Sequence, residues 1–185
     1  MEKSKVCPWW MGYLLLFPLR KIRHNPDQIA GPFLKPGMKV IDYGSAMGYF
    51  SLPMARMVGE TGRVYCFDIQ PRMFVNLLRR ARKAGLEQRI EPRLITGSDR
   101  DFEGMDQLAD FALLFAVAHE VPDQEALFAR LYRMLKPGAT LFFAEPPGHV
   151  KIREFLRSVS WAEKAGFRKS SAVDLRKLTV LFQKI

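Results

Sequence analysis

Short apolar runs alternate with segments of helical periodicity along most of residues 35–185. The runs Lys39–Asp42, Arg63–Ile69 and Ala109–Val117 are typical of buried strands, because a strand covered on both faces shows no alternation with polar residues. Between them, apolar residues recur every three or four positions, and these segments end at glycines, as helices commonly do. Strands that alternate with helices in this way predict a parallel sheet covered by helices.

The remaining elements follow from the same pattern. Asp123 is expected as a helix N-cap, and Pro92 favours an edge strand because proline cannot donate to the ladder. The last two strands, joined by a short basic turn, are expected to pair antiparallel. The expected helices cover residues 49–58, 71–85, 123–136 and 152–165, and the further strands cover residues 90–96, 139–144, 167–174 and 178–185.

Size and apolar content indicate one globular domain. The 185 residues suffice for one good core but not for two, and a hydrophobic share of 48% argues against a disordered chain. The longest apolar stretch, Trp9–Leu19, is broken by Gly12 and Pro18 and is shorter than the ~20 residues that span a bilayer. No small-residue cleavage site follows it, which argues against a secretory signal. Two cysteines make no disulfide framework, so we expect a reducing, cytoplasmic location and a buried thiol at Cys66.

The formal net charge of +10 favours anionic partners. Basic residues concentrate in residues 1–35, 72–100 and 145–185, which would suit nucleic acid, an acidic small molecule or a peripheral phospholipid surface. Solubility alone is the plainer explanation. Four basic side chains of the expected second helix would either track RNA phosphates or face solvent; they are Arg79, Arg80, Arg82 and Lys83.

A glycine-containing turn joins the first strand to the following helix. It runs DYGSAMG from Asp42 to Gly48, and its small residues let a ligand approach the backbone and the helix N–H groups. Asp68 ends the second strand 20 residues after Gly48, where an acid can accept both hydrogen bonds of a ribose diol. Each acid also has a structural explanation, since Asp42 can cap the turn and Asp68 can cap the helix that begins at Pro71. Their placement on two strand ends favours a ligand.

The dinucleotide fingerprint G-x-G-x-x-G fits this turn poorly. Counted from Gly44, the third position is Ala46 and the sixth is Tyr49, so two of the three glycines are missing. A pyrophosphate needs the close approach that those glycines permit. NAD and FAD are therefore disfavoured.

Three stretches resemble motifs of the class I S-adenosylmethionine-dependent methyltransferases, especially the small group similar to quinone-biosynthesis methyltransferases. The family's first motif, D-x-G-x-G-x-G, is similar to KVIDYGSAMGYFSLPMA, and its second-strand acidic motif to VYCFDIQPRM. Its fourth strand, following helix and fifth strand resemble FALLFAVAHEVPDQEALFARLYRMLKPGATLFFAEP. The resemblance covers residues 35–185. It implies an α/β, Rossmann-like, doubly wound and mostly parallel seven-stranded sheet with an antiparallel C-terminal strand.

The same resemblance implies S-adenosylmethionine as cofactor and no metal. The turn would shape the pocket for the methionine part, the second-strand end would hold the ribose and adenine, and the end of the fourth strand would line the floor near the methyl group. In that order the implied residues are Asp42, Gly44, Ser45, Ala46 and Gly48; Asp68 and Ile69, with Ser98 or Asp99 at the adenine amino group; and Phe115 and Ala116.

Two departures from the family pattern affect this assignment. Alanine stands at position 46 where the family's middle glycine is usual, which adds a methyl group near the ligand. Gly97-Ser98-Asp99 stands where Gly-Asp is usual, so either Ser98 or Asp99 would make the adenine contact.

The acceptor is less well specified. The N-P-P-Y type of motif used for amino groups of bases and glutamine is absent, which leaves oxygen, carbon, sulfur or other nitrogen acceptors. His119 follows the fourth strand, and its titration range suits a general base. The alternative is that residues 119–122 only anchor the entry to the next helix. His24 and His149 have no neighbours in sequence that suggest a metal site.

Residues 1–34 precede the expected domain of residues 35–185 and are assigned as an aromatic, basic lid segment. Trp9, Trp10 and Tyr13 would stack on a planar acceptor or close over the cofactor. Two alternatives stay open for this segment: it lies on an anionic membrane surface, or it packs as a helix on the core.

The sequence therefore predicts a methyltransferase that acts by direct displacement on a small, anionic or lipid-like molecule. An RNA acceptor and a non-catalytic, cofactor-binding partner subunit stay as alternatives. The acceptor and the oligomeric state are left open, because fold similarity does not name a substrate.

Overall fold

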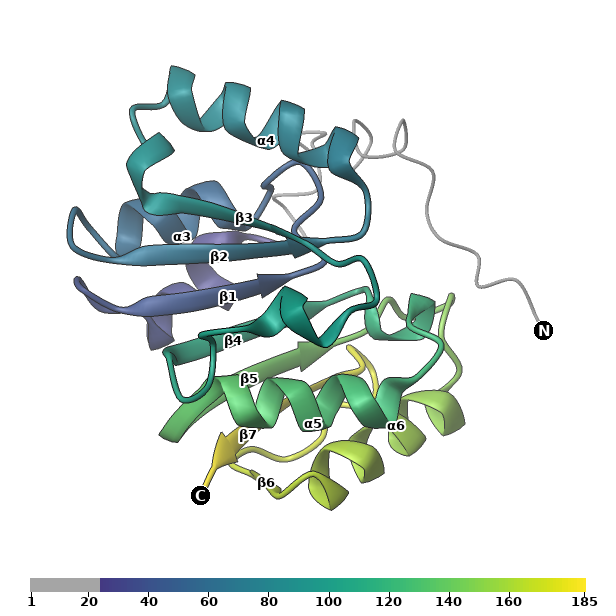
Figure 1. Ribbon diagram of the computed structural model, residues 1–185. Helices are drawn as coiled ribbons and strands as arrows, with labels where there is room; N and C mark the ends of the chain where they lie inside the picture. Colours follow the sequence, from purple (N-terminus) through teal and green to yellow (C-terminus); the bar gives the residue numbers. More distant parts are fainter. Residues whose placement is uncertain (1–23) are drawn as a thin grey trace. The chain divides into compact units, whose positions relative to one another are not determined.

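The computed structural model describes residues 24–185 (Figure 1). Seven strands have the order β3-β2-β1-β4-β5-β7-β6, and all neighbours whose register is given are parallel except those of β7. The expected fold class is confirmed. By internal contacts this part of the chain divides into two compact units, residues 24–103 and residues 104–185, which we call the amino-terminal and carboxy-terminal units.

The amino-terminal unit carries the first three strands and the helices between them. The strands are parallel, and Asp42 stands beside Cys66 in the β1–β2 register. Its elements are α2 (Pro26–Ile29), η2 (Gly31–Phe33), β1 (Lys39–Tyr43), α3 (Ser51–Met57), β2 (Arg63–Asp68), α4 (Pro71–Lys83), η3 (Glu87–Arg89), β3 (Ile90–Leu94) and η4 (Asp99–Phe102).

Local sequence explains these elements well. Strands β1 and β2 are buried at every position after the first, as their continuous apolar runs predict. Pro92 lies on β3, which is an edge strand, so its missing N–H removes no ladder bond on the open side. Helix α4 begins at Pro71. Cys66 is the buried free thiol that the sequence predicts, and burial raises its pKa well above the usual value.

The carboxy-terminal unit carries the other four strands. Strands β4 and β5 are parallel, whereas β7 runs antiparallel to both β5 and β6, as expected for the C-terminal pair. Its elements are β4 (Ala109–Phe115), η5 (Ala118–Glu120), α5 (Gln124–Met134), β5 (Leu135–Ala144), α6 (Ile152–Lys164), β6 (Phe167–Lys169) and β7 (Thr179–Lys184).

Helices α5 and α6 lie side by side in this unit (Figure 1) and share one aromatic core. Phe143 of β5 stacks on Phe155 of α6 with ring centroids 5.1 Å apart, and Phe128 of α5 meets it edge-on at 5.4 Å. Asp123 caps α5 by accepting the Ala126 N–H at 2.9 Å, which confirms the N-cap prediction.

Most boundaries differ from the sequence-based expectation by one or two residues, and the start of β5 and the end of β6 differ by more. Strand β5 begins at Leu135 and runs through Lys136-Pro137-Gly138, which the sequence indicates as a turn, and the β4–β5 register shifts there between Ala109 and Phe111. Helix α5 accordingly ends at Met134. Strand β6 has three residues rather than the predicted eight. Within residues 24–185, no helix is long and apolar enough to cross a membrane.

Candidate functional site

The carboxyl end of β1 is tied to the start of α3 by a buried side-chain pair. The Ser51 hydroxyl donates to Asp42 Oδ2 at 2.5 Å, and both residues are buried. Asp42 therefore does more than fill a turn position, because it fixes where the helix begins relative to the strand.

In the turn between β1 and α3, every second residue has a positive φ. Gly44, Ala46 and Gly48 have φ values of +79°, +46° and +80°, in the left-handed region that L side chains rarely adopt. The N–H groups of Gly44 and Ser45 both donate to the Phe67 carbonyl, at 2.9 and 3.0 Å, which anchors the turn on β2. Alanine thus adopts at position 46 the conformation for which the family pattern has glycine.

Asp68 connects the end of β2 to this turn. Its Oδ2 accepts the Ala46 N–H at 2.9 Å and its Oδ1 accepts the Gln70 N–H at 2.8 Å. Burial raises the pKa of the Asp68 carboxyl, although the backbone N–H groups that it accepts oppose the shift. The Ile69 N–H also favours the charged carboxylate, and the roughly four acceptor sites of its two oxygens still leave room for a ribose hydroxyl. The N-cap of α4 is Gln70 rather than Asp68, and Asp68 supports the helix start by accepting the Gln70 N–H.

Ser45 supplies an unsatisfied polar atom in the same turn. Its hydroxyl is buried, and no partner for it exists among residues 24–185, where only one other buried side-chain atom lacks one. A buried hydroxyl without a partner costs about 1–3 kcal/mol, so such an atom is unusual unless a ligand satisfies it. The turn therefore fits a ligand with polar groups.

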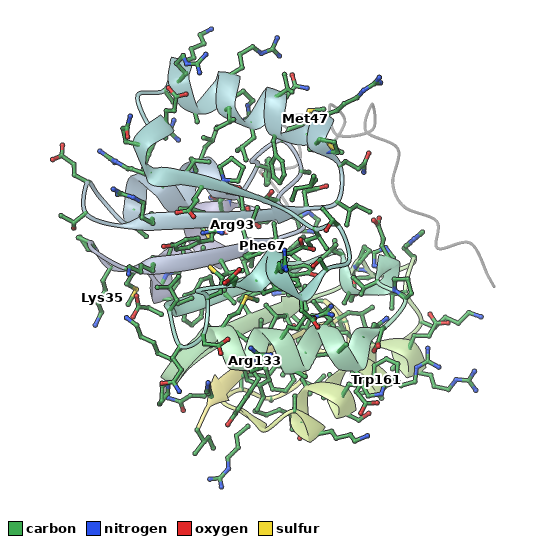
Figure 2. All side chains as sticks on the ribbon, viewed as in Figure 1. Lys35, Met47, Phe67, Arg93, Arg133 and Trp161 are labelled. Atoms are coloured by element: carbon green, nitrogen blue, oxygen red, sulfur yellow. The ribbon has the colours of Figure 1, made fainter. Side chains whose placement is uncertain are left out.

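Apolar surface borders the acid. Ile69 follows Asp68 directly and is 48% exposed, which is high for a large aliphatic side chain at a strand end. Two residues before Ile69, Phe67 (labelled in Figure 2) stacks on Tyr43 and on Phe102, with ring centroids 5.8 and 5.6 Å away. The exposed side chain offers a flat ring such as adenine an apolar contact.

Helix α4 supports the turn from outside. Arg80 donates to the carbonyl oxygen of Met47, and burial lowers the pKa of this guanidinium, with Arg56 adding a smaller effect in the same direction. A Cβ at Gly48 would stand 2.2 Å from Leu77 Cδ1. Gly48 is therefore required both by its backbone angle and by the close packing of α4.

The loop after β3 is organised by a residue that the sequence analysis missed. Asp101 accepts the N–H groups of Thr96, Gly97 and Ser98 at 2.7–3.2 Å and the Thr96 hydroxyl at 2.9 Å. Burial acts to raise the pKa of Asp101, but these four donors together outweigh it, so the pKa is lowered. The Ser98 side chain caps η4 by accepting the Arg100 N–H. Both Ser98 and Asp99 are exposed. The S-x-x-D capping pattern was the available signal.

The carboxy-terminal unit holds the predicted residues that follow β4. Phe115 ends the strand, and Ala116 has a left-handed φ of +58° while its N–H donates to Ala144 at 2.8 Å. Ala116 is one of four non-glycine residues with a positive φ in the described part of the chain, and such backbone strain clusters at functional sites.

His119 lies on η5 and is held by a residue that sequence reasoning also missed. Glu145 Oε1 accepts the His119 backbone N–H at 2.8 Å, and Oε2 stands 2.7 Å from ring Nδ1. The His149 ring meets His119 edge-on at 4.9 Å, and Glu120 Oε1 lies 4.0 Å from Nε2. Burial lowers the pKa of His119, but the Glu145 hydrogen bond and the charges of Glu145 and Glu120 outweigh it, so the pKa is raised.

The predicted cofactor residues from Asp42 to Asp99 thus lie in the amino-terminal unit, whereas Phe115, Ala116 and the His119–Glu145 pair lie in the carboxy-terminal unit. Trp9, Trp10 and Tyr13 lie outside the described residues. In the described part of the chain, no group of three histidine, cysteine, aspartate or glutamate residues is arranged to hold a metal ion.

Comparisons with known proteins bear on this geometry. A family model described as "Methyltransferase domain" matches residues 16–185. A crystal structure of a SAM-dependent methyltransferase from Aquifex aeolicus is 25% identical, has a TM-score of 0.80, and is matched over 96% of this chain and 97% of that one.

Curated relatives match a shorter stretch. The ubiquinone/menaquinone biosynthesis C-methyltransferase UbiE of Haemophilus ducreyi is 29% identical over 112 residues, which is 60% of this chain and 42% of that protein. Sterol methyltransferase-like 1 of Botryococcus braunii is 32% identical over 106 residues, which is 57% of this chain and 26% of that protein. The chain therefore spans less than half the length of either relative.

Proposed function

Because the chain belongs to the family of methyltransferase domains, of the class I kind that uses S-adenosylmethionine, we propose that it transfers a methyl group from that cofactor to a small-molecule acceptor. The observation that carries the proposal is the buried Asp68 carboxylate, which is bonded to the left-handed Ala46 of the glycine turn. A dinucleotide enzyme would need glycine at this position and at residue 49.

The residues present fit the cofactor. The unpartnered Ser45 hydroxyl would bond a polar group of its methionine part, and the remaining acceptor capacity of Asp68 would take a ribose hydroxyl. Ile69 would pack on the adenine. When bound, S-adenosylmethionine supplies a methyl group on a positively charged sulfur, which is a good leaving group for direct displacement. Alignment of the acceptor then supplies much of the acceleration.

Two observations support a small acceptor: the names of the relatives, and the internal bonds made by the basic side chains of α4. Two curated relatives are named for quinone biosynthesis and for sterols. Of the basic side chains of α4, Arg80 donates to the turn, Arg82 pairs with Glu87 at 2.6 Å, and Arg79 donates to Asn76. These internal bonds favour a structural role for the helix over phosphate binding.

The test is a methyl-transfer assay with labelled S-adenosylmethionine. The acceptors are 1,4-naphthohydroquinone, a sterol and total RNA, and S-adenosylhomocysteine release is measured in each. We expect release with a small acceptor and none with RNA. Label in RNA that falls steeply with salt would support an RNA methyltransferase instead. Cofactor binding without any turnover, together with stable co-purification of a second methyltransferase, would indicate a non-catalytic partner subunit.

A further inference from the structure

The buried carboxylate of Glu145 contacts a single residue, His119. It follows β5 directly, its side chain is 1% exposed, and both of its oxygens contact His119. An isolated carboxylate is costly to bury, so its bonding partner matters. Tying η5 to β5 would require only the bond to the backbone N–H. The second bond, to ring Nδ1, fixes the orientation of the imidazole as well.

That second bond also determines which ring nitrogen carries the proton. A carboxylate only accepts, so Nδ1 must donate and the neutral ring keeps a free lone pair on Nε2. Glu120 Oε1 lies 4.0 Å from Nε2, which is too far for a hydrogen bond. The side chain is 20% exposed, so the ring is not sealed in the core.

We propose that Glu145 is a positioning residue that holds His119 as the Nδ1–H tautomer, so that Nε2 accepts the proton lost by the methyl acceptor. The proposal rests on the proposed function, because only a methyl acceptor gives this nitrogen a proton to take. It adds Glu145 and the direction of proton transfer to the assignment of His119 as a base.

Charge balance requires such a proton acceptor. When a neutral X–H acceptor is methylated, a lone or π electron pair of the acceptor forms the bond to the methyl carbon, and the carbon–sulfur pair remains on sulfur. The X–H pair stays with X when its proton leaves. One proton is released, and it passes to His119 Nε2 and then to solvent. The imidazolium formed in between is stabilised by Glu145 and by the charge of Glu120.

The titration of His119 agrees with this role. The groups that face it in its unit are Glu145, Glu120 and the His149 ring. Its pKa is raised even though burial acts in the opposite direction, because the Glu145 bond and the two carboxylate charges favour the protonated ring. A base with a raised pKa binds the released proton more strongly than a free histidine does.

The test is ¹⁵N NMR of the full chain with labelled histidine, without cofactor. The chain has three histidines, and His24→Gln and His149→Gln variants assign the spectra. In neutral His119, we expect a protonated Nδ1 and an unprotonated Nε2, with a pKa above the usual value of about 6.5. Wild-type protein with the proton on Nε2 would overturn the proposal without any variant.

Glu145→Gln provides the second arm. Its amide oxygen can still accept the His119 backbone N–H, while its NH₂ group must donate to Nδ1, so the tautomer should reverse and block Nε2. Turnover of 1,4-naphthohydroquinone should fall by about 10²–10⁴-fold in kcat with little change in KM. Glu120→Gln is the matched control, since it removes a nearby charge and should lower the His119 pKa without changing the tautomer.

Failure of this inference is distinct from failure of the proposed function. Calorimetry with S-adenosylhomocysteine reports the cofactor site in the amino-terminal unit, which Glu145→Gln should leave unchanged. If wild-type protein binds the cofactor but Glu145→Gln keeps both the tautomer and kcat, the positioning role is wrong. If wild-type protein does not bind the cofactor, the proposed function is wrong as well.

Discussion

At the scale of single residues, Ala46 holds a conformation that suits glycine. An L residue in the left-handed region costs roughly 1–2 kcal/mol, and this one lies next to the acid proposed to bind the ribose. The alanine at position 46 therefore keeps the turn geometry of the family pattern while it stores local strain, as functional turns often do.

Ala46→Gly should relieve this strain. Glycine loses about 0.4–1 kcal/mol more conformational entropy on folding, so we expect a net gain of about 0.5–1 kcal/mol in the free energy of unfolding. Urea denaturation measures it. The matched control is Ala129→Gly on the exposed face of α5, which should lose about 0.5–1 kcal/mol. A loss at position 46 equal to that of the control would show that the alanine is unstrained.

His119 should make stability depend on pH. Its folded pKa is raised above the unfolded value of about 6.5, so its stabilising contribution is complete below that value and is lost as pH rises through the folded pKa. The deficit of His119→Gln relative to wild type should be larger at about pH 5.5 than at about pH 9, measured by urea denaturation at both. A deficit that grows with pH would contradict the raised pKa.

At the scale of elements, the glycine turn depends on helix α4. Leu77 is fully buried, so its side chain must shift within a packed core to make room for a Cβ at residue 48, and Arg80 bonds the turn carbonyl. The helix is thus part of the cofactor site although none of its side chains need touch the ligand.

Gly48→Ala should be more harmful than loss of glycine flexibility alone. Overpacking against Leu77 adds about 1–3 kcal/mol to the roughly 1–2 kcal/mol of backbone strain. The control is Gly85→Ala, whose φ is also left-handed (+68°) but whose Cβ would meet nothing within 4 Å. Denaturation of both variants separates the two effects, and equal losses would rule out a packing role for Gly48.

The elements were predictable wherever local pattern decides them. Apolar runs located β1, β2 and β4, and Asp123 located the start of α5. The start of β5 was missed because Lys136-Pro137-Gly138 has turn chemistry, and only pairing with β4 extends the strand through it.

The candidate site was predictable in part for the same reason. Asp42, Asp68 and the glycines were found because the motif is contiguous within each strand end. Glu145 was missed because its partner His119 is 26 residues away, and a partnership formed by folding leaves no spacing signal. Asp101 was local, but its capping pattern was overlooked in favour of Asp99.

At the scale of the whole molecule, cofactor binding should stabilise the chain. A ligand that binds only the folded protein adds about 2.7 kcal/mol at 100 times its Kd. S-adenosylhomocysteine should therefore raise the Tm in a concentration-dependent way, and NAD should not. A Tm that rises with NAD alone would show that the glycine turn binds a dinucleotide instead. Thermal unfolding followed by circular dichroism is sufficient for the comparison.

The central claim is that Asp68 and the glycine turn bind S-adenosylmethionine, and calorimetric titration of the wild-type chain tests it most directly. We expect a Kd in the micromolar range, about 8 kcal/mol, which Asp68→Ala weakens by about 10–100-fold while Asp27→Ala, an exposed acid on α2, does not change it. Circular dichroism confirms that both variants fold. No binding by wild-type protein, or equal binding by a folded Asp68→Ala variant, would contradict the account.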